Sequence, residues 1–315
     1  RDMGVTWYGK EVVNVNNLQG YSMWGWGEND DGSLGQNQGT PSSSYSSPVQ
    51  VSGSWHDQKL FWGLQSNRTL WFIGGFSSQG AAGNNTNSIK FSSPVQIPGT
   101  TWDKIGGSRM VGRAIKTDNT LWTWGTNAHG ALGQNDGLQR SSPTQIPGTT
   151  WGSVLISMST GGDVTGGSVK TDGTLWMWGR NNYGELGIND DNSRSSPVQV
   201  PGTTWSNADH KLCAAVDSTH AIKTDGTLWQ WGNNEGYAGA GWGPGVGSDY
   251  SSPIQLGTDT TWAKIAANTF KAYYAIKTNG TLWAWGYGDA GQLGLNSRTN
   301  YSSPRQVGTD TTWRN

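Results

Sequence analysis

The sequence predicts an all-β fold, a β-propeller of four-stranded blades, with six blades favoured and seven as the alternative. Three observations carry this prediction: a repeat of about 50 residues, about four short strand patterns in each repeat, and tryptophans at fixed places along it. The 315 residues include 48 Gly and 20 Trp, both far above ordinary usage, whereas only 14% are charged. We interpret the tryptophan excess as packing between sheets, because one indole ring buries about 150–250 Å².

Three short anchors mark the repeat. The first, Leu-Trp-x-Trp-Gly, ends at the following glycines, the first two in degenerate copies: Gly27, Gly74, Gly125, Gly179, Gly232 and Gly286. The second, Ser-Ser-Pro, has its proline at Pro48, Pro94, Pro143, Pro197, Pro253 and Pro304. The third is a tryptophan that begins the next unit, at Trp55, Trp102, Trp151, Trp205, Trp262 and Trp313, with Trp7 in the same slot. We therefore divide a single domain, 1–315, into units 7–54, 55–101, 102–150, 151–204, 205–261 and 262–312, and 313–315 begins a further or closing strand.

Each unit carries strand and turn signals only. Residues 221–232 read as a β-branched run, an Asp225-Gly226 turn and then strict alternation of apolar and polar residues, which is a strong hairpin signal. The phrases Trp-x-x-Ile, Ala-Ile-Lys-Thr, Thr-Leu-Trp-x-Trp-Gly and Ser-Pro-x-Gln-Val give the strands of one unit. No segment shows a sustained helical period. Radial stacking of such sheets as propeller blades buries their faces and shortens their exposed edges.

Together, Leu-Trp-x-Trp-Gly, Gly-x-Leu-Gly (as at 184–187) and Ser-Ser-Pro resemble the regulator of chromosome condensation (RCC1-like) repeat. The phrase Ala-Ile-Lys-Thr-Asp-Gly-Thr-Leu-Trp is more similar to bacterial and phage repeats than to eukaryotic ones. The resemblance covers nearly the whole chain and implies a β-propeller, usually of seven blades. Two features depart from the family. No His lies at the family spacing before Ala114, Ala221 or Ala275, and only six full units are visible. Six blades are favoured because the first unit, 7–54, looks complete.

Composition excludes several classes of partner. Lys plus Arg number 21 against 22 Asp plus Glu, a net charge of −1, so we expect no nucleic-acid binding. No apolar stretch of about 18 residues is present and no signal-peptide pattern opens the chain, so we expect no membrane insertion. The one cysteine, Cys213, lies in an apolar run and is predicted to be a buried, inert thiol.

Catalytic and metal-binding signatures are missing from the sequence. The four histidines lack metal-ligand spacing, and no Gly-x-Ser-x-Gly elbow is present. Residues 286–291 match Gly-x-Gly-x-x-Gly but open no helix, so a dinucleotide site lacks its structural context. The acidic runs 28–31 and 189–192 are interpreted as turns rather than calcium loops. We therefore expect no catalytic residues, no metal, no cofactor and no enzymatic activity.

The candidate binding residues lie in loops where the repeats differ. A repeat protein displays its specificity where equivalent loops vary, and these loops are polar, mostly uncharged and scattered with aromatic residues. The alternative is that their Asn, Gly, Ser and Asp residues simply form turns. For Trp242, which lies outside the repeat slots, the alternative is a ring folded back over a glycine-rich loop. The candidate ligand-binding residues are Trp242, Tyr237, His129, Tyr183 and Tyr287.

These observations favour a non-enzymatic surface or virion-associated propeller, structural or for recognition, that binds a protein or a glycan through its variable loops, with subunits of a larger assembly as further partners. The alternative is a secreted, inhibitor-like module that captures one protein. The resemblance also implies a nucleotide-exchange factor, which is less favoured because the chain has no basic tail. An enzyme is less favoured because no catalytic site is evident in the sequence. The uncharged polar surface suits an extracellular or virion setting, since its contacts depend little on ionic strength. Exposed aromatics at similar places in several blades would favour a glycan, and one aromatic patch a protein.

Overall fold

The computed structural model describes residues 7–10, 20–27, 29, 32, 34–36, 44–59, 61–76, 79–86, 90–108, 110–157, 165–215, 217–234, 249–268 and 271–313. These residues form β-strands and turns with one short 3-10 segment, η1 (Ala128–Gly130), so the all-β prediction is confirmed. The chain divides into two compact units, Arg1–Asn127 with Leu138–Thr149, and Ala128–Gly137 with Thr150–Asn315. Each unit is described by itself, and one domain spanning 1–315 stays a prediction.

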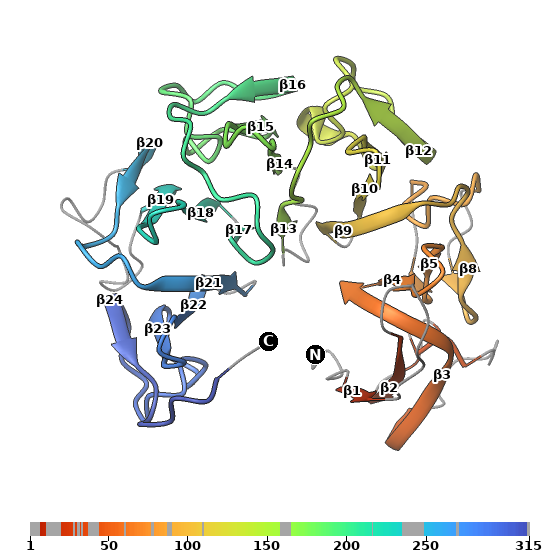
Figure 1. Ribbon diagram of the computed structural model, residues 1–315, viewed down its shortest axis with the longest axis horizontal. Coiled ribbons are helices and arrows are strands. Elements are labelled where there is room, and N and C mark those ends of the chain that lie inside the picture. Colours follow the sequence, from red (N-terminus) through yellow and green to blue (C-terminus); the bar gives the residue numbers. More distant parts are fainter. Residues whose placement is uncertain are drawn as a thin grey trace. The chain divides into compact units, whose positions relative to one another are not determined.

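The second unit shows the blade pattern most fully (Figure 1). One blade is an antiparallel sheet in chain order, formed by β17 (Leu212–Ala214), β18 (Ser218–Ile222), β19 (Leu228–Gly232) and β20 (Tyr250–Gln255). The next has the same order, with β21 (Trp262–Ala267), β22 (Ala272–Lys277), β23 (Leu282–Gly286) and β24 (Tyr301–Gln306). The preceding blade contains β14 (Thr165–Val169), β15 (Leu175–Gly179) and β16 (Arg194–Gln199). Its inner segment, 151–157, is attached by the Trp151–Lys170 bridge and ends in β13 (Ile156–Ser157), which pairs with β17.

The first unit contains two four-stranded antiparallel groups and a three-stranded one. One four-stranded group is β9 (Trp102–Ser108), β10 (Val111–Lys116), β11 (Leu121–Gly125) and β12 (Arg140–Ile146). The other is β3 (Tyr45–Lys59), β4 (Trp62–Gln65), β5 (Leu70–Phe72) and β8 (Val95–Gln96). The three-stranded group is formed by β1 (Trp7–Lys10), β2 (Tyr21–Gly27) and β3, in that order, so β3 belongs to this group and to the preceding one. A separate two-stranded sheet is formed by β6 (Gly75–Phe76) and β7 (Lys90–Phe91).

The predicted blade count is wrong. The described residues form 5 four-stranded blades, counting the inner segment 151–157 as a strand, rather than six or seven. The first repeat differs in the position of Trp7. Trp7 pairs with Trp24, and the equivalent partner of Trp229 in a complete blade is Ala221 of the second strand. Trp7 therefore lies in a second strand and not in the inner strand that the sequence anchors predicted. Its outer strand, β3, is 15 residues long and continues as the inner strand of the next blade. Sequence anchors alone could not distinguish a shared strand from two separate ones.

A side-chain relay explains why the predicted hairpin turn recurs. Asp225 Oδ1 accepts hydrogen bonds from the Thr227 N–H (3.0 Å) and hydroxyl (2.6 Å), and the Thr227 hydroxyl accepts one from Trp229 Nε1 (2.8 Å). The aspartate thus forms an Asx-type turn that also orients the indole. The same relay joins the first, third and fifth residues of segments 67–71, 118–122, 172–176 and 279–283.

A lysine covers the half-buried tryptophan of four of these hairpins. Lys223 Nζ lies 3.8 Å from the Trp229 ring centroid and 4.9 Å from that of Trp205. Lys116, Lys170 and Lys277 make the equivalent pairs of contacts in their own blades. This is a cation–π arrangement, in which one ammonium group contacts two tryptophan rings of the same blade. The repeated half-buried tryptophans thus have a structural role, in the hairpin relay and in contact with lysine.

The second tryptophan of the anchor joins neighbouring repeats. Trp178 is fully buried and donates its indole N–H to the Ala131 carbonyl 2.9 Å away, one repeat earlier. Trp124 does the same with Ala81 (3.0 Å). A Cβ on Gly166 would overlap the Trp178 indole, so glycine is required beneath this ring. The packing interpretation is confirmed by the fully buried rings Trp55, Trp62, Trp102, Trp124, Trp151, Trp178, Trp205, Trp231 and Trp285.

Candidate functional site

In each blade the variable loops share one end of the sheet. Ser218 of β18 pairs with Gly232 of β19, whereas Ile222 pairs with Leu228 beside the Asp-Gly turn. The turn between the first and second strands therefore lies at the same end of the sheet as the loop between the third and fourth strands. The Asp-Gly turn, between the second and third strands, lies at the opposite end. We call this the loop end of a blade.

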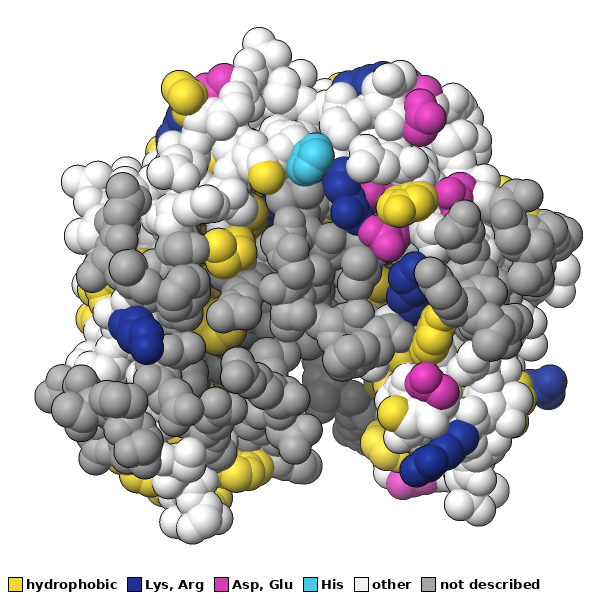
Figure 2. Space-filling view, turned by 180° about the vertical axis from the view of Figure 1, so that it is seen from behind, with side chains coloured by type: hydrophobic (Ala, Val, Ile, Leu, Met, Phe, Trp, Pro, Cys, Tyr) yellow, Lys and Arg dark blue, Asp and Glu magenta, His cyan; other side chains and the backbone are white. Residues whose placement is uncertain are grey.

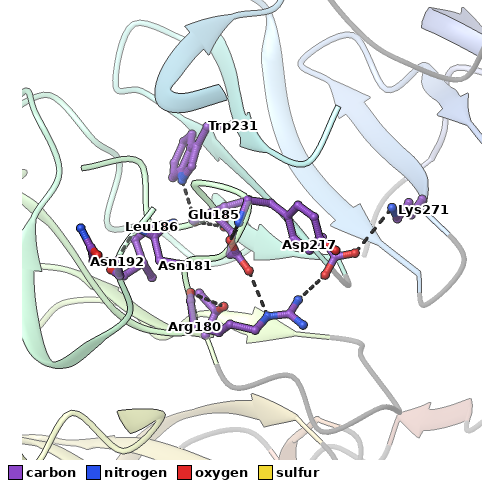
Figure 3. Close-up of polar contacts among 11 residues, drawn as sticks. Arg180, Asn181, Glu185, Leu186, Asn192, Asp217, Trp231 and Lys271 are labelled. Carbon is purple, nitrogen blue, oxygen red and sulfur yellow. Dashed lines mark hydrogen bonds and ion pairs between the residues drawn. The ribbon is translucent and has the colours of Figure 1, made fainter. Parts of the chain in front are cut away.

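Four charged residues from three successive repeats meet at the loop end of the second unit (Figure 3). Arg180 Nε donates to Glu185 Oε1 at 3.0 Å, and Arg180 Nη2 donates to Asp217 Oδ1. Lys271 Nζ lies 3.5 Å from Asp217 Oδ2 and donates to Asn233 Oδ1 at 2.9 Å. We call Arg180, Glu185, Asp217 and Lys271 the charged cluster.

The repeat pattern places these side chains where other repeats carry mostly uncharged ones. Arg180 directly follows the Leu-Trp-x-Trp-Gly anchor, a slot that holds Thr126, Asn233 and Tyr287 elsewhere. Glu185 is the variable residue of Gly-x-Leu-Gly, equivalent to Ala131 and Gln292. Asp217 and Lys271 occupy the same slot in successive repeats, and each carbonyl accepts a backbone N–H from the residue after the anchor glycine. The backbone hydrogen bond at this slot is thus the same in both repeats, whereas the side chain differs from one repeat to the next.

Glu185 is the buried member of the charged cluster. Its side chain is 2% exposed, and its Oε2 accepts the Tyr183 N–H at 2.7 Å. Burial raises the pKa of Glu185 above its usual value, and the hydrogen bonds and the Arg180 cation oppose this effect without cancelling it. The nearby Asp217 carboxylate raises the pKa further. A carboxylate held in such surroundings costs folding free energy, which is typical of functional sites.

An asparagine keeps the loop that carries Glu185 in one conformation. Asn181 is fully buried, and its Oδ1 accepts the Leu186 N–H at 2.8 Å. Its Nδ2 donates to the carbonyls of Asp190 (2.8 Å) and Asn192 (3.1 Å). Three backbone groups of the loop are thereby bound to one side chain, so Arg180 and Glu185 project from a fixed backbone.

The cations of the charged cluster face outward more than its anions do. The side chains of Lys271 and Arg180 are 25% and 21% exposed, against 14% for Asp217 and 2% for Glu185. On the face drawn in Figure 2, the described acidic and basic side chains occur in several small groups. The two cationic side chains of the cluster are therefore more accessible to solvent than its two anionic ones.

Two of the five candidate residues predicted from sequence lie beside the charged cluster. Tyr183 is half-buried, with its ring centroid 6.0 Å from the Arg180 guanidinium carbon. Tyr287 is half-buried, and its N–H donates to the Lys271 carbonyl at 3.1 Å. His129 is exposed in η1 with φ 54°, and no described contact joins it to the cluster. Trp242 and Tyr237 lie outside the described residues.

Sequence reasoning missed all four members of the charged cluster. The available signal was the comparison between repeats, because these slots carry charge in a chain with 14% charged residues. That signal could show that each position was unusual. It could not show that residues as far apart as Arg180 and Lys271 meet, since their contact with Asp217 depends on how the blades stack.

Burial favours the neutral forms of His220, Tyr273 and Cys213. Burial lowers the pKa of His220 to about 3, and its ring packs 4.2 Å from Tyr273. The Tyr273 hydroxyl is hydrogen-bonded to Ser218 Oγ at 2.9 Å, and burial raises its pKa. Cys213 is buried with a raised thiol pKa, as predicted. Within the described ranges, no three His, Cys, Asp or Glu side chains are grouped to hold a metal ion, and no helix is long and apolar enough to cross a membrane.

A family model places this chain among known repeats. The model of the regulator of chromosome condensation (RCC1) repeat matches residues 118–166, 172–207 and 279–313. The resemblance drawn from the sequence anchors is therefore confirmed, and the chain carries RCC1 repeats.

Several curated proteins are similar to this chain. Ultraviolet-B receptor UVR8 of Arabidopsis thaliana is 24% identical over 304 residues, covering 92% of this chain and 66% of that protein. The mitochondrial RCC1 domain-containing protein RUG3 of the same plant is 28% identical over 210 residues, covering 64% of this chain and 45% of that protein. Human E3 ubiquitin-protein ligase HERC2 is 25% identical over 196 residues, which are 61% of this chain but 4% of the ligase. The chain thus spans only part of the length of these relatives.

Solved structures confirm the β-propeller fold. Human WBSCR16 is similar with a TM-score of 0.72 at 18% identity, covering 92% of this chain and 77% of that one. A structure of Kap60 bound to yeast RCC1 (Prp20) is similar with a TM-score of 0.70 at 16% identity, covering 92% of this chain and 72% of that one.

Proposed function

Because this chain carries RCC1 repeats in an all-β propeller fold, we propose that it is a non-enzymatic recognition module that binds a protein partner through the loop end of its second unit. The observation that carries the proposal is the charged cluster. Arg180, Asp217 and Lys271 come from three repeats and are joined by ion pairs. They occupy positions at which the residue type varies from repeat to repeat.

Energetics support a role in recognition rather than in stability. Partly exposed ion pairs contribute about 0–1 kcal/mol each to folding, whereas one buried tryptophan contributes several kcal/mol. The repeat relays and buried rings already hold the blades together without the charged cluster. Burial of Glu185, with its raised pKa, makes folding less favourable. A cluster that adds little to stability and fixes the direction of Arg180 suits a contact surface.

The similar solved structures supply a second line of support. One contains yeast RCC1 bound to Kap60, and another is of Prp20p from Saccharomyces cerevisiae, which is described as binding Gsp1p and histones. These binding properties belong to those proteins. They support protein recognition as the class of function here, and they leave the identity of the partner to experiment.

Two finer forms of the proposal differ in assembly. A surface or virion-associated propeller would be found in a multi-copy particle, and a secreted inhibitor-like module would be found as a one-to-one complex. Mass measurement of the natively isolated protein distinguishes them. The polar, uncharged surface supports an extracellular or virion setting in either form.

Site-specific photocrosslinking tests the proposal. A benzoylphenylalanine at Tyr183 samples the loop end, and a matched one at the exposed Thr171 samples the Asp-Gly turn end of the same blade. We expect one defined protein adduct from position 183, lost when Lys271→Gln is added, and none from position 171. Equal adducts from both positions, or none from position 183 in the native source, would contradict the proposal.

A further inference from the structure

We propose that the charged cluster recognises an acidic segment of the protein partner, with Lys271 and Arg180 as the cations that contact its carboxylates. This inference rests on the proposed function and names the chemistry of the partner. It follows from the exposure of the four charged side chains and from the ion pairs and hydrogen bonds that they already make.

The orientation of the cluster favours an anion. Its two cations are 25% and 21% exposed at the side chain, and its two anions 14% and 2%. Lys271 and Arg180 are therefore the side chains of the cluster most accessible to a partner approaching from solvent. Partly desolvated cations of this kind form charge-assisted hydrogen bonds with carboxylates.

Asp217 holds the two cations on either side of one carboxylate. Its Oδ1 accepts from Arg180 and its Oδ2 lies 3.5 Å from Lys271 Nζ. Both carboxylate oxygens of Asp217 thus contact a cation. Both oxygens of Glu185 accept hydrogen bonds, one from Arg180 Nε and the other from the Tyr183 N–H. An incoming cation would meet carboxylates that are already satisfied.

Lys271 provides the clearest donor. An ammonium group has three N–H donors, and the described acceptors of Lys271 are Asn233 Oδ1 at 2.9 Å and, more loosely, Asp217 at 3.5 Å. A partner carboxylate can therefore bind Lys271 without breaking its contact with Asn233. The Tyr183 ring lies beside Arg180 and supplies an amphipathic side chain next to the cations.

Overall charge cannot supply this attraction. The chain has a net charge of −1, so an acidic peptide is not drawn to the protein as a whole. The cluster itself holds two cations and two anions, so binding must come from direct contacts with the more exposed cations, and the Debye length of about 8 Å at physiological salt confines their attraction to nearby groups. We expect binding to weaken steeply as salt increases.

Fluorescence anisotropy with a labelled heptaglutamate peptide tests the inference, with heptaglutamine and heptalysine as controls. We expect heptaglutamate alone to bind, and Lys271→Gln to weaken it about tenfold, the loss of one charge-assisted contact. Lys271→Arg should restore binding because it keeps the charge. The matched control is Arg298→Gln, which removes an exposed cation of the same repeat and should leave affinity unchanged.

The outcomes separate this inference from the proposed function. Failure of heptaglutamate to bind, or equal weakening by Lys271→Gln and Arg298→Gln, overturns recognition of an acidic segment. A specific crosslink from position 183 would still support protein recognition in that case. Preferred binding of heptalysine would show that the anions of the cluster dominate, which also overturns the inference. Lys271 was chosen because Arg180→Gln leaves Glu185 buried without its cation.

Discussion

Trp231 donates its indole N–H to the backbone carbonyl of Glu185, 2.8 Å away in the preceding repeat. The Thr219 hydroxyl donates to the same carbonyl at 2.8 Å. The residue whose side chain holds Arg180 therefore has its backbone fixed by a core tryptophan of the next blade. Packing and site are connected at this point, because the ring that joins two blades also sets the position of the buried carboxylate.

Removal of a core indole should destabilise the fold severely. Trp178→Ala deletes a fully buried ring and its hydrogen bond to Ala131, so we expect a loss of about 3–5 kcal/mol in the free energy of unfolding. Urea denaturation measures this loss. Leu138→Ala, at a side chain that is 65% exposed, is the control and should change stability little. An unchanged denaturation midpoint for Trp178→Ala would disprove the packing assignment.

The hairpin relay should contribute measurably but modestly. Thr227→Val removes the hydroxyl that links Asp225 to Trp229 while keeping the side-chain shape, so we expect a loss of about 1–2 kcal/mol. The comparison is Thr258→Val, an exposed threonine of the same repeat. Thermal unfolding of both variants gives the difference. Identical melting of the two would show that the relay is incidental to stability.

Glu185→Gln should change how stability depends on pH. The pKa of Glu185 is raised in the folded state, mainly by burial, so its proton-linked stability is present below the unfolded pKa and is lost as pH rises through the folded one. The glutamine variant has no such loss. We therefore expect its stability relative to the wild type to improve between about pH 4 and pH 7, measured by urea denaturation. A constant difference across this range would contradict the raised pKa.

The opposite sign applies to Asp259. Burial alone would raise its pKa, but hydrogen bonds from Lys277 and Thr261 outweigh burial and lower the pKa to about 2. Its contribution to stability is present above the unfolded pKa and is lost as pH falls through the folded one. Asp259→Asn should therefore be less stable than the wild type at about pH 6 and similar to it near about pH 2, as urea denaturation at the two pH values would show. A gap that persists at low pH would assign the effect to something other than ionisation.

The repeat pattern predicted the fold because it is local. Asp-Gly turns, alternation along the third strand and tryptophans in fixed slots are readable within one repeat, and hydrogen-bond relays such as Asp225–Thr227–Trp229 act within five residues. The blade count depended on whether β3 is shared between two repeats. That is decided by pairing partners, which anchors such as Trp7 do not specify.

The site was predicted only in part, for a related reason. Tyr183 and Tyr287 were selected as aromatic residues in variable loops, and both lie beside the charged cluster. The charged residues themselves belong to different repeats, and each is unremarkable within its own loop. Trp242→Ala stays a prediction from the sequence, with impaired binding and unchanged stability expected.

Hydrogen–deuterium exchange with and without heptaglutamate tests the central claim most directly, because it reports where on the chain an acidic ligand binds. The account predicts slower amide exchange in the loop 180–187 and around Asp217 and Lys271, reduced in Lys271→Gln. Protection confined to the Asp-Gly turns at 172–173 and 225–226 and the Asn-Gly turn at 279–280 would contradict it, because those turns lie at the opposite end of the blades.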